Sequence, residues 1–126
     1  MGLTTAGRDV FAAAIIGATA TLFNSANARI GVGDGGGTPF ANTQTDLAGT
    51  NKLRKAMDAT YPTVTGNTLT FRSTFTTSEA VWSWAEWGVF NAAAAGTMLN
   101  RKVEALGTKP NDQSWQITAT LTVIAA

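Results

Sequence analysis

The sequence predicts a mainly β protein: an antiparallel β-sandwich-like single domain over residues 1–126, with one N-terminal α-helix. Residues 68–75 and 115–123 both alternate apolar and polar side chains with a period of two. Each segment then has one apolar face and one threonine-rich face, which favours antiparallel sheets over a parallel α/β architecture. A length of 126 residues suits one domain with its own core.

The one expected helix lies near the N-terminus. Thr4 or Thr5 can cap a helix that begins near Ala6, and Gly17 can end it. Its apolar stripe would contain Val10, Phe11, Ala14 and Ile15. No basic region precedes the apolar run 10–18, so we interpret this run as a helix rather than a signal peptide.

Further strands are expected along the chain. Residues 28–32 form a short apolar strand candidate, and residues 86–91 and 97–103 are expected to pair as a hairpin. The glycines after the first of these fit a G-x-G-x-x-G spacing, but Thr38 and Pro39 follow where a nucleotide site needs a helix to begin. We therefore expect no nucleotide site there.

Composition argues against most enzyme classes. Histidine and cysteine are both absent, and the eight acidic residues are scattered without a paired spacing. These absences remove the commonest general base, the thiol nucleophile and the usual zinc ligands. We expect no catalytic residue, metal or cofactor.

The balance of charge also limits the expected partners. A net charge of +1 gives no strong attraction to nucleic acid, and no apolar stretch approaches a membrane span. Charged residues make up only 13 % of the chain, against about 25 % in an ordinary soluble domain. Such a surface fits either a robust threonine-rich β domain or a subunit that neighbours cover in an assembly.

The segment 82–90 concentrates aromatic residues around a carboxylate, Glu86. If the strand is regular, Trp82, Trp84 and Glu86 share one face, and Trp87 lies on the other. A buried Glu86 needs a cation or several N–H donors. The available cations are Arg54, Arg72, Arg101 and Lys102. We favour this structural role over a general base, because no second catalytic group lies nearby in the sequence.

Two other features are candidates for binding. Gly33, Asp34, Gly35, Gly36 and Gly37 form a candidate assembly loop, which we expect to be mobile until a neighbour contacts it. Exposed tryptophans would instead suit stacking on sugars, so a carbohydrate-binding module is the alternative function.

Several short motifs, in order, resemble the N-terminal module of phage tail-collar fibre proteins and a set of short phage virion proteins. They are Leu3-Thr4-Thr5-Ala6-Gly7, Ile30 to Gly37, Thr45-Asp46-Leu47, Asn67 to Phe71, Glu86 to Asn91, and Gly96 to Leu99. The resemblance covers nearly the whole chain.

The resemblance implies a non-enzymatic structural protein of the virion, in a collar, tail or capsid-decorating position. Its implied partners are other virion proteins and further copies of itself, with a trimer expected because the resembling fibres are trimeric. The printed chain contains the module without a fibre's repetitive shaft, so we expect attachment or decoration rather than host recognition. Nothing in the sequence supports a host glycan as a ligand.

Overall fold

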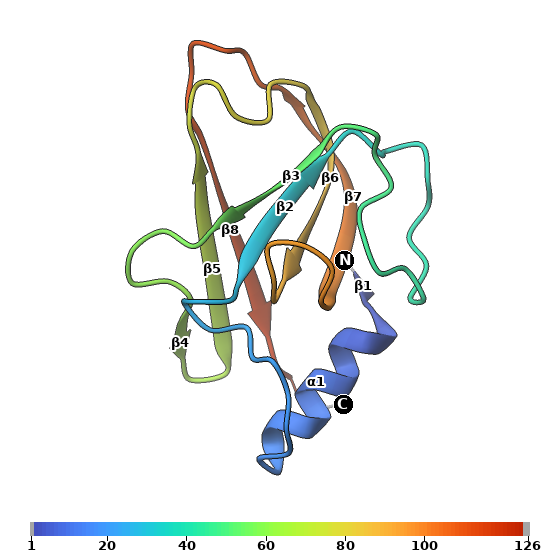
Figure 1. Ribbon diagram of the computed structural model, residues 1–126, viewed down its shortest axis with the longest axis vertical. Helices are drawn as coiled ribbons and strands as arrows, with labels where there is room; N and C mark the ends of the chain where they lie inside the picture. Colours follow the sequence, from blue (N-terminus) through green and yellow to red (C-terminus); the bar gives the residue numbers. More distant parts are fainter. Residues whose placement is uncertain (1, 125–126) are drawn as a thin grey trace.

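The computed structural model describes residues 2–124 and confirms a mainly β fold with one helix (Figure 1). Its elements are β1 (Gly2–Leu3), α1 (Thr5–Ile15), β2 (Arg29–Gly33), β3 (Lys52–Ala56), β4 (Thr63–Thr65), β5 (Thr68–Phe75), β6 (Ser83–Phe90), β7 (Met98–Thr108) and β8 (Trp115–Thr122).

The strands form two antiparallel sheets. The larger has the order β1-β7-β6-β2-β3 and the smaller the order β4-β5-β8. The two segments with the clearest alternation, β5 and β8, pair with each other along their full lengths, with Phe71 opposite Ala119. The hairpin expected from residues 86–91 and 97–103 is the β6–β7 pair.

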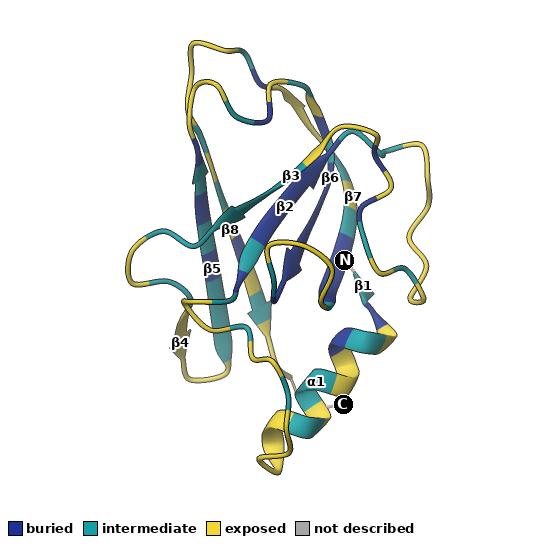
Figure 2. Cartoon of the chain, in the orientation of Figure 1, coloured by how far each residue is buried: buried dark blue, intermediate teal, exposed yellow. Residues whose placement is uncertain are grey.

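The core lies between the inner faces of the two sheets (Figure 2). Trp84 meets Phe75 and Trp115 edge to face, with ring centroids 5.0 and 5.1 Å apart. The other buried members of this cluster are Ala28, Ile30, Val32, Phe71, Ala80, Trp87, Val89, Leu99 and Ala119. Contributions from both sheets make this the main core, between two layers as the alternating pattern predicts.

The two sheets are joined on one side and separated on the other. Just after β3, the Asp58 N–H donates to Arg72 O at 2.8 Å, and Ser73 Oγ donates to Lys55 O at 3.1 Å. Between β7 and β8, by contrast, lie two hollows of about 320 and 420 Å³. We call this side, between β7 and β8, the open side.

Helix α1 begins as predicted, but only the first half of its predicted apolar stripe, Val10 and Phe11, is half-buried. Thr4 caps it by accepting the Gly7 N–H at 2.9 Å, and Gly7 is the one buried residue of the helix. A Cβ at Gly7 would lie 2.6 Å from the carbonyl oxygen of Leu99, so the first turn packs directly on β7. Later turns extend beyond the sheet, which leaves Ala14 and Ile15 exposed, Ile15 by 82 %.

The expected regularity of β6 is also wrong. Two irregularities in its pairing with β7 lie between Trp84 and Glu86 and between Val89 and Phe90. As a result, Trp84 packs in the core, whereas Glu86 faces away from it, toward residues 35 and 48–49. An irregular strand breaks the simple alternation that would have put both side chains on one face.

Candidate functional site

Glu86 is the centre of a buried polar cluster on the outer face of the larger sheet. Arg101 of β7 donates from Nε to Glu86 Oε1 at 2.7 Å, and both side chains have zero exposure. This identifies Arg101 as the cation that the sequence analysis left open among four candidates. The expected structural pairing of Glu86 is confirmed.

Three backbone N–H groups complete the environment of the carboxylate. Glu86 Oε1 accepts from Ala48 at 2.9 Å, and Oε2 accepts from Gly35 at 2.9 Å and Gly49 at 2.7 Å. These donors belong to residues 34–51, which connect β2 to β3 and which we call the covering loop. Sequence analysis did not identify Ala48 or Gly49, because backbone donors leave no residue-type signal.

The other nitrogens of Arg101 hold the covering loop in place. Nη2 donates to Gly35 O at 2.9 Å and Nη1 to Gln44 Oε1 at 3.3 Å. At the strand end of the loop, Asn51 donates to both carboxylate oxygens of Asp34, at 3.1 and 2.8 Å. These bonds, the side-chain one foremost, hold the pKa of Asp34 below its ordinary value.

This arrangement disfavours Glu86 as a general base. Each carboxylate oxygen already accepts two hydrogen bonds, and the side chain has no contact with solvent. A general base needs a lone pair within reach of a substrate proton. Nor do residues 2–124 contain a cluster of three potential metal-binding side chains.

The loop Gly33 to Gly37 is held against the sheet for most of its length, and its expected mobility in the free subunit stays a prediction. Gly33 is buried, and Gly35 both donates to Glu86 and accepts from Arg101. A Cβ at Gly36 would lie 2.8 Å from that of Ala85, whereas one at Gly37 would meet nothing within 4 Å. Because these glycines have no side chain, the loop backbone can approach β6 closely.

The tryptophans do not form an exposed stacking surface. Trp84 and Trp87 are only 2 % and 8 % exposed, and Trp82 and Trp115 are half-buried against the same core. The sugar-binding alternative rested on exposed tryptophans, so it lacks its structural premise.

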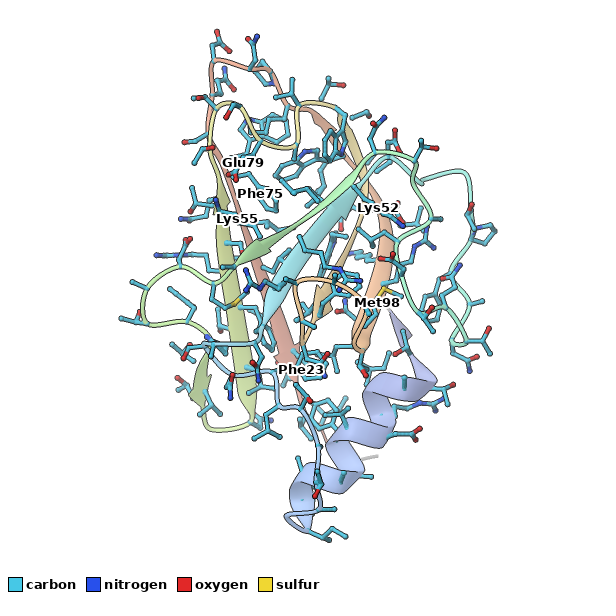
Figure 3. All side chains as sticks on the ribbon, viewed as in Figure 1. Phe23, Lys52, Lys55, Phe75, Glu79 and Met98 are labelled. Carbon is cyan, nitrogen blue, oxygen red and sulfur yellow. The ribbon has the colours of Figure 1, made fainter. Side chains whose placement is uncertain are left out.

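The three basic residues of β3, Lys52, Arg54 and Lys55, all form ion pairs within the chain. Lys52 and Arg54 both contact Asp46, at 2.8 and 3.3 Å, and Lys55 contacts Glu79 at 2.9 Å. Figure 3 labels Lys55 and Glu79, which lie side by side. Because Lys52 and Arg54 share one carboxylate, the three cations keep a single excess positive charge, which is too little for a basic patch that would attract a nucleic acid.

An apolar groove of about 340 Å³ lies at the end of the molecule beside α1. Phe23, labelled in Figure 3, is one of its lining residues. The lining residues are Val10, Phe11, Ala14, Leu22, Phe23, Asn24, Pro62, Thr63, Val64, Leu69, Phe71 and Leu99. The sequence analysis missed it, because its walls come from five separate parts of the chain.

Comparison with known proteins adds no relative: no family model matches the chain, and no curated protein matches its sequence. No helix in the described part of the chain has the length and apolar character needed to cross a membrane.

Replacing Glu86 tests the structural role of the cluster. Glu86→Ala should lower the free energy of unfolding by about 3–5 kcal/mol, because it leaves a buried guanidinium and three N–H groups without their acceptor. In urea unfolding followed by tryptophan fluorescence, the double variant with Arg101→Ala should cost less than the sum of the singles. A Glu86→Ala variant as stable as wild type would contradict this role.

Two glycine substitutions separate packing from flexibility in the covering loop. Gly35→Ala should destabilise the fold by about 1–3 kcal/mol, because its methyl group would lie 2.8 Å from the carbonyl carbon of Ala48. Gly37→Ala is the matched control and should stay within about 0.5 kcal/mol of wild type. Equal midpoints in thermal unfolding would show that Gly35 is not tightly packed.

The Lys55–Glu79 pair should contribute to acid sensitivity. The hydrogen bond from Lys55 is the main cause that lowers the pKa of Glu79 from 4.5 to about 2. Its stabilisation is therefore present above the unfolded pKa and is lost as the pH falls toward 2. Urea unfolding across this range should show a shallower loss of stability for Glu79→Gln than for wild type. Asp112→Asn, in an exposed turn, is the control and should retain the wild-type slope.

Proposed function

We propose that this chain is a structural subunit of a bacteriophage virion, in a collar, tail or capsid-decorating position, that acts by protein–protein assembly. The order of short motifs that resembles the tail-collar module supports the phage assignment. The observation that carries the assembly function is an exposed apolar surface at one end of the molecule.

Six of the ten large apolar side chains exposed in residues 2–124 gather at this end. They are Ile15, Ile16, Leu22, Val64, Val123 and Ile124, which we call the apolar end. Leu22 and Val64 line the apolar groove, and Val123 is tied to Asn67 beside β4 by two hydrogen bonds of 2.9 and 2.8 Å. Figure 2 shows this end, around the tip of α1 and β4, largely exposed.

Two neighbouring side chains of the apolar end are almost fully exposed, which supports a role for this surface in binding. Ile15 and Ile16 are 82 % and 80 % exposed, although they follow each other at the end of a helix. Scattered apolar residues are ordinary on a protein surface, but a contiguous apolar patch marks an interaction site. Burial of this surface against a neighbour in a particle would remove it from water.

The internal chemistry supports the same proposal. Two of the three charged residues with zero exposure in the described chain, Glu86 and Arg101, bind each other and the covering loop, which fits a role in rigidity rather than in catalysis. A rigid subunit loses little conformational entropy when it assembles. Attachment by shape and apolar contact needs neither metal nor cofactor.

The test is to purify intact phage particles through a density gradient and quantify this chain by mass spectrometry. We expect its peptides to sediment with particles at a fixed ratio to the major capsid protein. Ile15→Asp with Ile16→Asp should lower incorporation by about tenfold or more, through loss of apolar contact. Ala93→Asp with Ala94→Asp, on the exposed hairpin tip, is the control. Recovery of the wild-type chain only outside particles would contradict the proposal.

A further inference from the structure

The sheet edges differ in how they are protected from pairing with another chain. β1 and β4, each at one edge of a sheet, have only two and three residues. β3 is charged and is tied to β5 by the bond from Ser73 to Lys55 O. Short strands and charged side chains are the usual devices that prevent edge pairing.

The exposed part of β7 is protected in a similar way. β1 covers it at Asn100 and Arg101, and beyond this point it carries the Lys102–Glu104 ion pair, at 3.0 Å. Its pairing with β6 is irregular at two places, and irregular strands bend away from a potential partner.

β8 has none of these protections. It runs for eight residues, Trp-Gln-Ile-Thr-Ala-Thr-Leu-Thr, without a charge, a proline or a glycine. In the described chain it pairs only with β5, so its other edge has no strand partner from Trp115 to Thr122. Alternating threonine with apolar or aromatic residues is the composition with the strongest tendency to form sheets.

This edge borders the open side of the sandwich. The hollow of about 320 Å³ is lined by Ile117, Thr118, Ala119 and Thr120 on β8 and by residues of β6 and β7. Ile117 and Leu121 point to the core face but remain half-buried, because no strand lies beside them. An added strand would cover both side chains and satisfy the outward-facing backbone groups.

We propose that the occupant of this edge is β8 of a second copy, paired antiparallel about a twofold axis. The result is a dimer, in place of the trimer that the resemblance implies, with a continuous sheet of order β4-β5-β8-β8-β5-β4. The inference deepens the proposed assembly function and rests on it. The occupant is a second copy because this edge is complementary to itself. β8 has no charged residue, so no like charges meet when two copies pair. A twofold axis also places the apolar faces of the two strands on one side and their polar faces on the other.

The period-2 pattern limits the register. Antiparallel partners point to the same face, so even-numbered threonines must pair with even-numbered residues. The axis then passes through a residue, and the longest overlaps place it at Thr118 or Ala119. With the axis at Thr118, this residue lies opposite Thr118 of the partner subunit. With the axis at Ala119, Thr118 lies opposite Thr120 of the partner subunit.

Both registers make the same charge test decisive. In Thr118→Lys with Thr120→Lys, ammonium groups face one another across the axis, so the dimer dissociation constant should rise by about tenfold or more. The same positions changed to Glu should act alike, and an equimolar mixture of the two variants should restore a dimer. Sedimentation of the full chain at micromolar concentration measures the mass of the species present, which is compared with the subunit mass of 13.1 kDa.

The control uses the opposite edge of the same sheet. Thr63→Lys with Thr65→Lys changes two exposed threonines on β4 and should leave the dimer intact. Equal loss in this control would show association through the threonine faces rather than the edge, and would overturn the proposal. Circular dichroism checks that each variant folds.

Hydrogen exchange of the wild type provides a test without substitution. Amide protection of β8 should increase with protein concentration, because pairing occupies its outward N–H groups. A wild type that sediments as a monomer or trimer, or a Lys variant that dimerises like wild type, would overturn β8 pairing. Neither result would alter particle incorporation, which tests the proposed function separately.

Discussion

The burial of one carboxylate determines how the outer face of the larger sheet is built. Glu86 cannot remain ionised without solvent unless cations and N–H donors replace its hydration. Arg101 supplies the cation, and Gly35, Ala48 and Gly49 supply the backbone donors. The covering loop must therefore lie flat against β6. Glycine is required at Gly33, the last residue of β2, and at Gly35 of the loop, because a side chain at either position would collide with the carboxylate group.

A second, smaller apolar cluster depends on the same loop. Leu47 of the loop packs on Phe90 and Met98, on the face of the sheet opposite the main core. The guanidinium of Arg54 lies over the Phe90 ring at 3.7 Å and closes the cluster from the side. Polar anchoring at Glu86 and apolar packing at Phe90 thus stabilise one loop at two positions on the same side of β6. By contrast, Ile15 and Ile16 at the C-terminal end of α1 are largely exposed within the described chain.

The features of the fold that could be predicted were those that follow from the alternation of apolar and polar residues over a few positions. The alternation of β5 and β8 follows from side chains that point to opposite faces, so their pairing could be expected. The partner of Glu86 could not be chosen, because an extra residue, Leu99, shifts the β6–β7 register and brings Arg101 to the same face as Glu86. Local sequence also gives no sign that Ile15 extends past the sheet, because that depends on where α1 docks.

The long sequence separations in the Glu86 cluster have a consequence for how the chain reaches its native state. The carboxylate is 15 residues from Arg101, but its bonds to Gly49 and Gly35 span 37 and 51 residues. Such distant contacts form only after the entropy of closing large loops has been overcome. The β6–β7 hairpin can therefore form early, whereas the covering loop closes late. Until it closes, Glu86 and Arg101 lack the hydrogen bonds that the loop supplies to them, so their burial is only partly compensated.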